Sequence, residues 1–102
     1  MYTEDRNLHY FREISRIPRK SFHEKAVVDY IQHFAEERGL RFQRDTLHNL
    51  ILWAPATPGW EGEAPLMLQA HTDMVCAKEP WSTHDFLKDT IELAEENGWL
   101  HA

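Results

Sequence analysis

A histidine and an aspartate two residues apart, His71 and Asp73, are the side chains with the clearest capacity for chemistry. Because residues two apart on an extended segment point to the same side, their imidazole and carboxylate would share one pocket. The carboxylate would then either determine the tautomer of the ring or support a metal-bound nitrogen from behind. The same tripeptide also arises by chance, and the structural alternative is a histidine at a strand end that bonds a loop carboxylate.

Two further groups of residues near this pair have a structural interpretation that we favour. Cys76 lies three residues after Asp73 and would suit a thiolate ligand or a redox switch, but a lone cysteine is more often a buried thiol. His84 and Asp85 are adjacent in a loop, where a hydrogen bond that orders the loop is the simpler interpretation. Of the seven histidines, His71 is therefore the one with a case for chemistry.

The chain ahead of the pair is predicted to form two helices. Leu8, Phe11 and Ile14 recur on one helical face, and Pro18 ends this first helix. Residues 21–24 read Ser-Phe-His-Glu, the pattern of a capping box at the start of a second helix. That helix is predicted from apolar residues at spacings of one, three and four, namely Val27, Val28, Ile31, Phe34 and Ala35.

The hydrophobic period changes from helical to strand-like after the second helix. Residues 40–44 alternate between apolar and polar, and residues 50–53 are apolar, so the two runs predict a hairpin. A loop rich in proline and glycine follows. Residues 66–70 then predict a short apolar strand, which we expect to be covered on both faces and to end directly at His71.

A second hairpin is predicted toward the end of the sequence. Residues 90–93 and 99–101 flank an Asn-Gly pair, which is a strong hairpin turn signal. The order of elements favours an α/β fold, with two N-terminal helices followed by a mixed sheet with a C-terminal hairpin. Because no helix follows to cover the last strand, we expect residues 1–102 to be one incomplete domain.

Length, charge and cysteine content exclude several classes of protein. The 102 residues suffice for one domain, and 42% hydrophobic and 27% charged residues are ordinary for a globular chain. The net charge of -6 argues against nucleic-acid binding, which relies on a basic surface. One cysteine cannot form an internal disulfide and suits a reducing cytosol. With no signal peptide and no long apolar run, we expect a cytoplasmic protein without a membrane partner.

The chain carries a series of separated motifs, which are ISRIPRKSFHE, ERGLRFQRDTLHNLIL, PATPGWEGEAP, LMLQAHTDMVCAK, HDFLKDTIEL and NGWLHA. In this order they resemble the aminoacyl-histidine dipeptidases (Xaa-His dipeptidases) of the superfamily of di-zinc aminopeptidases, carboxypeptidases and deacylases. The resemblance extends from about residue 8 to the end of the sequence. It implies part of a zinc-peptidase catalytic domain.

The resemblance also implies roles for the two residues singled out above. His71 corresponds to a ligand of one zinc ion in a pair, and Asp73 to a catalytic residue that orients His71 and tunes the metal. The implied reaction is hydrolysis of a Xaa-His dipeptide by metal-activated water. Cobalt or manganese are alternatives to zinc, because histidine and carboxylate sites accept several metals.

The chain departs from the family in its length. In the family the aspartate that bridges the two metals, the general-base glutamate and the other ligands follow the last hairpin. A catalytic zinc needs about three protein ligands, whereas His71 is the one assigned here. We therefore expect the N-terminal part of a catalytic domain, inactive as an isolated chain. The alternative is a folded fragment without activity that acts as a binding module or self-assembles as a homo-oligomer.

Overall fold

The first helix, α1, spans Arg6–Ser15 in the computed structural model, which describes residues 5–102. Asp5 caps its N-terminus, because the Asp5 carboxylate accepts a hydrogen bond from the backbone N–H of Asn7 at 2.9 Å. The helix ends shortly before Pro18, whose ring disfavours helical backbone in the preceding residue. The predicted first helix is confirmed.

The second helix, α2, spans Lys25–Glu37 and buries one apolar stripe. Val27, Val28 and Ala35 on this stripe are at most 2% exposed, and they make up the buried hydrophobic core of the described chain. Gly39, with a φ of 63°, follows the helix in the left-handed conformation that is common just after a helix end. The predicted amphipathic pattern is confirmed.

The capping box predicted at the start of α2 is wrong. The helix begins after Glu24, which makes no side-chain cap, and Ser21 lies outside it. The Ser21 hydroxyl donates a hydrogen bond to the carboxylate of Asp73, while the Glu24 carboxylate accepts from the backbone N–H of Phe22 at 2.7 Å. The Ser21 hydroxyl, which the local pattern predicted to cap the helix, therefore forms a tertiary hydrogen bond with Asp73 instead.

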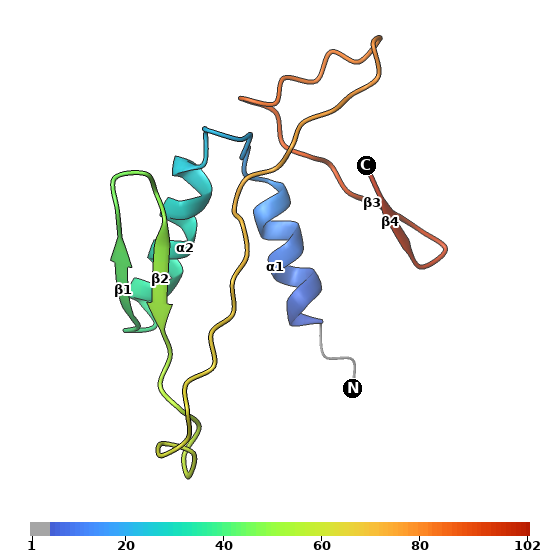
Figure 1. Cartoon of the computed structure of the whole chain (residues 1–102). Helices are drawn as coiled ribbons and strands as arrows, with labels where there is room; N and C mark the ends of the chain where they lie inside the picture. The colour runs from blue at the N-terminus through green and yellow to red at the C-terminus, as the bar shows by residue number, and fades with distance from the viewer. Residues whose placement is uncertain (1–4) are drawn as a thin grey trace.

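A hairpin of two strands lies beside α2 (Figure 1). β1 spans Arg41–Arg44 and β2 spans Leu50–Trp53, and the two pair antiparallel along their full length, as predicted. Arg44 joins the hairpin to the helix, because its guanidinium contacts the carboxylate of Asp29 at 2.7 Å and the side-chain carbonyl of Gln32 at 3.0 Å. The helix and hairpin therefore form one locally packed unit.

The apolar strand predicted at residues 66–70 is not formed. This segment is extended but has no partner strand in the described chain, and Figure 1 draws it as a plain ribbon. Leu66, Met67 and Leu68 are 86–87% exposed, so neither face is covered. A strand requires a neighbour that accepts and donates its backbone hydrogen bonds, and no neighbour lies within residues 5–102.

The turn and the second strand of the C-terminal hairpin are confirmed, whereas the first strand predicted at residues 90–93 is wrong, because the strand lies at residues 94–96. β3 spans Ala94–Glu96 and pairs antiparallel with β4, Trp99–His101. Asn97 and Gly98 between them have φ values of 52° and 79°, which suit the two-residue turn that this dipeptide favours. A salt bridge of 3.1 Å from Arg12 to Glu95 ties the hairpin to α1.

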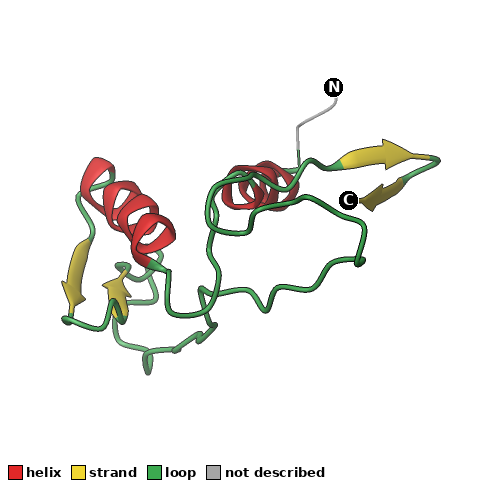
Figure 2. Ribbon diagram, turned by 90° about the horizontal axis from the view of Figure 1, so that it is seen from above, coloured by secondary structure: helices red, strands yellow, loops and turns green. Residues whose placement is uncertain are grey.

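The strands form two separate antiparallel sheets, and the arrangement as a whole is open (Figure 2). The radius of gyration is 16.8 Å, against about 13 Å for a compact domain of this length. The accessible surface is 8982 Å², against about 6,000 Å² for a compact protein of this mass. The expected order of two helices and then strands is confirmed. Neither helix in the described part is long and apolar enough to cross a membrane.

Candidate functional site

The loop between α1 and α2 contacts the segment that carries His71 and Asp73. The backbone N–H of Met74 donates to the carbonyl of Arg19 at 2.8 Å, and Lys20 and Met74 form an isolated parallel bridge. The guanidinium of Arg19 also donates to the carbonyl of Thr72 at 3.3 Å. These contacts hold the backbone on both sides of Asp73 against a loop more than 50 residues earlier in the chain.

His71 and Asp73 lie side by side, as the spacing of the two residues predicts. Nδ1 of His71 is 2.9 Å from Oδ1 of Asp73 and 2.9 Å from its backbone carbonyl oxygen. Both neighbours are acceptors, so Nδ1 must carry the proton and donate it. The neutral ring therefore has its lone pair on Nε2, and the His71 side chain is 79% exposed.

Asp73 is the more enclosed member of the pair, with a side chain that is 29% exposed. Its Oδ2 accepts a hydrogen bond of 2.5 Å from the hydroxyl of Ser21. This hydrogen bond, and then the one from His71, lower the pKa of Asp73 below its ordinary value of 3.8, against a smaller opposing effect of desolvation. The carboxylate is thus held ionised. Sequence reasoning missed Ser21, because nothing local links it to a residue 52 positions away.

The described residues do not fit a catalytic zinc site. Residues 5–102 contain no group of three or more histidine, cysteine, aspartate or glutamate side chains that could hold a metal ion. A catalytic zinc takes about three protein ligands, and His71 offers one free nitrogen. Asp73 already uses both carboxylate oxygens in hydrogen bonds. This part of the chain supplies at most one ligand and its supporting carboxylate.

The other candidate residues are engaged in structural contacts. The Cys76 thiol is half-buried and donates to the backbone carbonyl two residues earlier at 3.4 Å. The carboxylate of Asp85 accepts from the backbone N–H two residues later at 2.9 Å, so it orders the loop as expected. His84 packs edge-on against Phe86, with ring centroids 4.7 Å apart. Its Nε2 is buried without a hydrogen-bond partner.

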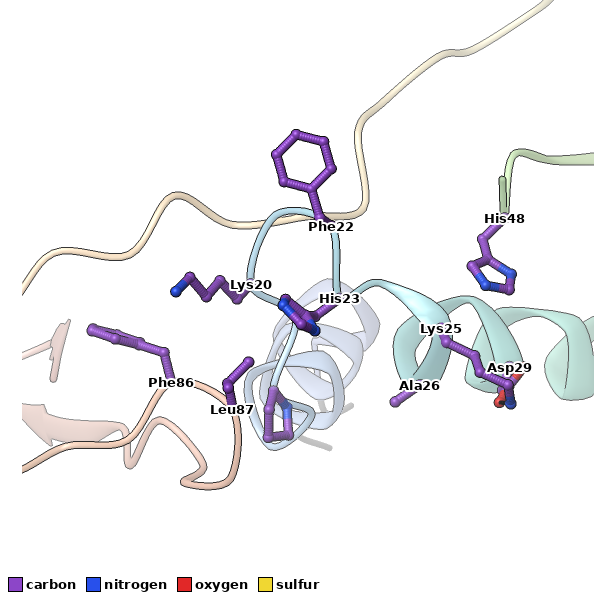
Figure 3. A pocket seen from close by; sticks show the side chains of 10 residues that line it. Lys20, Phe22, His23, Lys25, Ala26, Asp29, His48, Phe86 and Leu87 are labelled. Atoms are coloured by element: carbon purple, nitrogen blue, oxygen red, sulfur yellow. Dashed lines mark hydrogen bonds and ion pairs between the residues drawn. The ribbon is translucent and has the colours of Figure 1, made fainter. Parts of the chain in front are cut away.

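An open hollow of about 610 Å³ is lined in part by the α1–α2 loop (Figure 3). It is lined by basic, apolar and acidic side chains, which are Pro18, Lys20, Phe22, His23, Lys25, Ala26, Asp29, His48, Phe86 and Leu87. Its one carboxylate, that of Asp29, is paired with Lys25 at 2.7 Å. Neither His71 nor Asp73 lines the hollow, so it is separate from the pair.

Comparisons with known proteins show that this chain is similar to two dipeptidases. No family model matches the chain. The cytosol non-specific dipeptidase of Escherichia coli (strain K12) is 40% identical over 92 residues, which are 90% of this chain and 19% of that protein. The crystal structure of the aminoacylhistidine dipeptidase from Vibrio alginolyticus matches with a TM-score of 0.85 and 39% identity, over 90% of this chain and 19% of that one.

Both relatives are dipeptidases by name, and they confirm the resemblance that the motifs indicated. The α/β arrangement of two helices and two hairpins occurs in a solved dipeptidase. The chain nevertheless spans about one fifth of the length of each relative. In sequence and in fold, therefore, nine tenths of this chain is similar to a portion of a dipeptidase.

Proposed function

We propose that this chain is the N-terminal part of a metal-dependent cytoplasmic dipeptidase that hydrolyses Xaa-His dipeptides. Its similarity to two dipeptidases supports this, since one is named for aminoacyl-histidine substrates and the other for the cytosol. The observation that carries the proposal is the geometry of His71. Its Nδ1 is bound to the Asp73 carboxylate and its Nε2 is free, which is the usual arrangement of a histidine that ligates a metal.

In this proposal His71 is a metal ligand and Asp73 orients it. The proposed cofactor is zinc, with two ions in the complete site, and cobalt or manganese are alternatives. The remaining ligands and the general base would be supplied from outside residues 5–102. A dipeptide would be the partner of the complete enzyme, and neither nucleic acid nor a membrane is proposed as a partner.

A zinc titration of the 102-residue chain tests the claim that its own residues do not complete a site. We expect weak binding that His71→Ala changes little, because one imidazole competes poorly with water and buffer. We also expect no hydrolysis of a Xaa-His dipeptide. Tight binding that is lost in His71→Ala would show instead that this chain holds the metal by itself.

A complementation experiment tests the proposed origin. The chain is combined with the E. coli relative from which the 92 matching residues have been deleted, and hydrolysis of a Xaa-His dipeptide is measured. We expect activity above that of either piece, and its loss with His71→Ala. The control is His33→Ala, which removes an exposed histidine that pairs with Glu37 on α2. The relative's own 92-residue segment is the positive control. If that segment restores activity and this chain does not, the proposal fails.

A second candidate function, self-assembly, is favoured by the exposed apolar segment at residues 66–70. None of its backbone N–H groups or carbonyls bonds another segment of the described chain. The surface of one chain in excess of a compact protein, about 3,000 Å², is larger than the roughly 800 Å² that each partner buries in a standard dimer. We propose that two copies pair this segment antiparallel, because an unpaired apolar strand is a template for another chain.

The oligomeric state of the chain tests this second candidate. Light scattering after size exclusion should give a dimer, and Leu68→Lys should shift it to the monomer. Leu47→Lys is the control, because Leu47 is 79% exposed in the turn between β1 and β2. A wild-type chain that stays monomeric at high concentration, or equal effects of the two substitutions, would contradict self-assembly through this segment.

A further inference from the structure

Ser21 lies in a turn whose backbone is unusual. The next residue, Phe22, has a φ of 69°, in the left-handed region that bulky residues rarely adopt. Its side chain is 95% exposed, so packing of the ring does not explain the conformation (Figure 3). The turn is held by hydrogen bonds from the N–H of Phe22 to Glu24 at 2.7 Å, and from the N–H of His23 to the carbonyl of Lys20 at 2.8 Å.

The turn places the Ser21 hydroxyl against the carboxylate of Asp73. Each oxygen of this carboxylate has its own partner, Ser21 on Oδ2 and His71 on Oδ1. The contacts of Arg19 with the flanking backbone determine where Asp73 lies, but they leave its carboxylate free to rotate. The Ser21 hydroxyl limits this rotation from the side opposite His71, since turning the carboxylate would break its hydrogen bond to Oδ2.

We propose that Ser21 is a positioning residue, whose hydroxyl holds the Asp73 carboxylate so that His71 keeps its proton on Nδ1 and presents an unprotonated Nε2 to solvent. Strained backbone is frequent where a structure holds a functional group in place, and Phe22 supplies that strain next to Ser21. The use of His71 in dipeptide hydrolysis rests on the proposed function. The tautomer of the ring does not, and it is measurable in this chain alone.

The test compares two substitutions of nearly equal shape, Ser21→Thr and Ser21→Val, of which only the first keeps a hydroxyl. The ratio of the two neutral tautomers of His71 is read from its ¹⁵N chemical shifts at about pH 8.5, above the ordinary histidine pKa of about 6.5. We expect the Nδ1–H form to dominate in the wild type and in Ser21→Thr. In Ser21→Val we expect its ratio to the Nε2–H form to fall about threefold or more, the effect of losing one hydrogen bond.

Two further measurements separate positioning from a general loss of structure. Exchange of the Met74 amide, which bonds Arg19, reports whether the loop contact survives in each variant. Phe22→Gly, in the same turn, keeps the hydroxyl and should leave the tautomer ratio unchanged. Equal ratios in Ser21→Thr and Ser21→Val, or a wild-type ring protonated mainly on Nε2, would overturn the inference. Both readouts are independent of hydrolysis, so a failed complementation experiment would leave this result intact.

Discussion

The unit of α2 and its hairpin, residues 25–53, contrasts with the chain that follows it. In the first region the apolar stripe of α2 is buried, and Val28 is fully inaccessible to solvent. In the second, apolar residues such as Leu66, Met67 and Trp81 are more than 80% exposed. Both regions contain apolar segments of the kind that is usually buried. In the first region the segment that packs against the apolar residues is nearby in the chain, and in the second it is not. A pattern thus predicts that a segment can be buried, while a neighbour decides whether it is.

Polar contacts differ between the two regions in the same way. Arg44 reaches back 15 residues to Asp29 and 12 to Gln32, which joins strand to helix within one local unit. Asp73 is hydrogen-bonded to Ser21, which lies 52 residues earlier in the loop between α1 and α2. Contacts over short loops form at a low entropic cost, and those over long loops require the rest of the fold to bring the segments together. We therefore expect the first region to be the more stable.

The largest expected effect is that of placing a charge in each region in turn. Val28→Asp buries a carboxylate without a partner, so it should lower the free energy of unfolding by about 3 kcal/mol or more. Val75→Asp, at a site 83% exposed, should change it by less than about 0.5 kcal/mol. Urea unfolding followed by circular dichroism measures both. Similar effects of the two substitutions would remove the distinction between the regions.

A smaller effect is expected on the stability of the first region at acidic pH, because that stability depends on the ion pairs of Asp29. Hydrogen bonds from Lys25 and then from Arg44 lower the pKa of Asp29 below its ordinary 3.8. Because the pKa of Asp29 is lower in the folded than in the unfolded state, the ionised carboxylate stabilises the folded protein at pH values above the unfolded pKa of 3.8. This stabilisation is lost as the pH falls from 3.8 through the folded pKa of Asp29. The urea midpoint of the wild type should therefore drop over this range more than that of Asp29→Asn. Glu36→Gln, on the same helix, is the control, and equal acid sensitivity of all three proteins would contradict the prediction.

The smallest expected effect is at the turn before α2, where Ser21 contacts Asp73 of the second region. Phe22→Gly removes a bulky residue from a left-handed backbone conformation, and the exposed ring gives up no packing. Relief of strain outweighs the greater freedom of glycine in the unfolded chain, so we expect a gain of about 0.5 kcal/mol in unfolding free energy. Thermal unfolding measures the change. A loss of stability would show that the ring has a contact partner in solution.

Local patterns predicted most of the secondary structure. The apolar spacing of α2, the alternation in β1 and the Asn97-Gly98 turn each depend on residues within a few positions of one another. The strand at residues 66–70 failed, because its apolar run indicates burial without indicating what covers it. The capping box failed at Ser21, where the same hydroxyl serves a tertiary hydrogen bond in place of a local one.

The sequence alone determined the helices, the hairpins and the juxtaposition of His71 with Asp73, because each depends on backbone period or on two residues that are nearly adjacent. The tertiary structure alone decided that Ser21 bonds the second oxygen of Asp73. It also decided that residues 66–70 stay uncovered. These features depend on which segments far apart in the chain come into contact, and a local sequence pattern does not predict which distant segments lie close together.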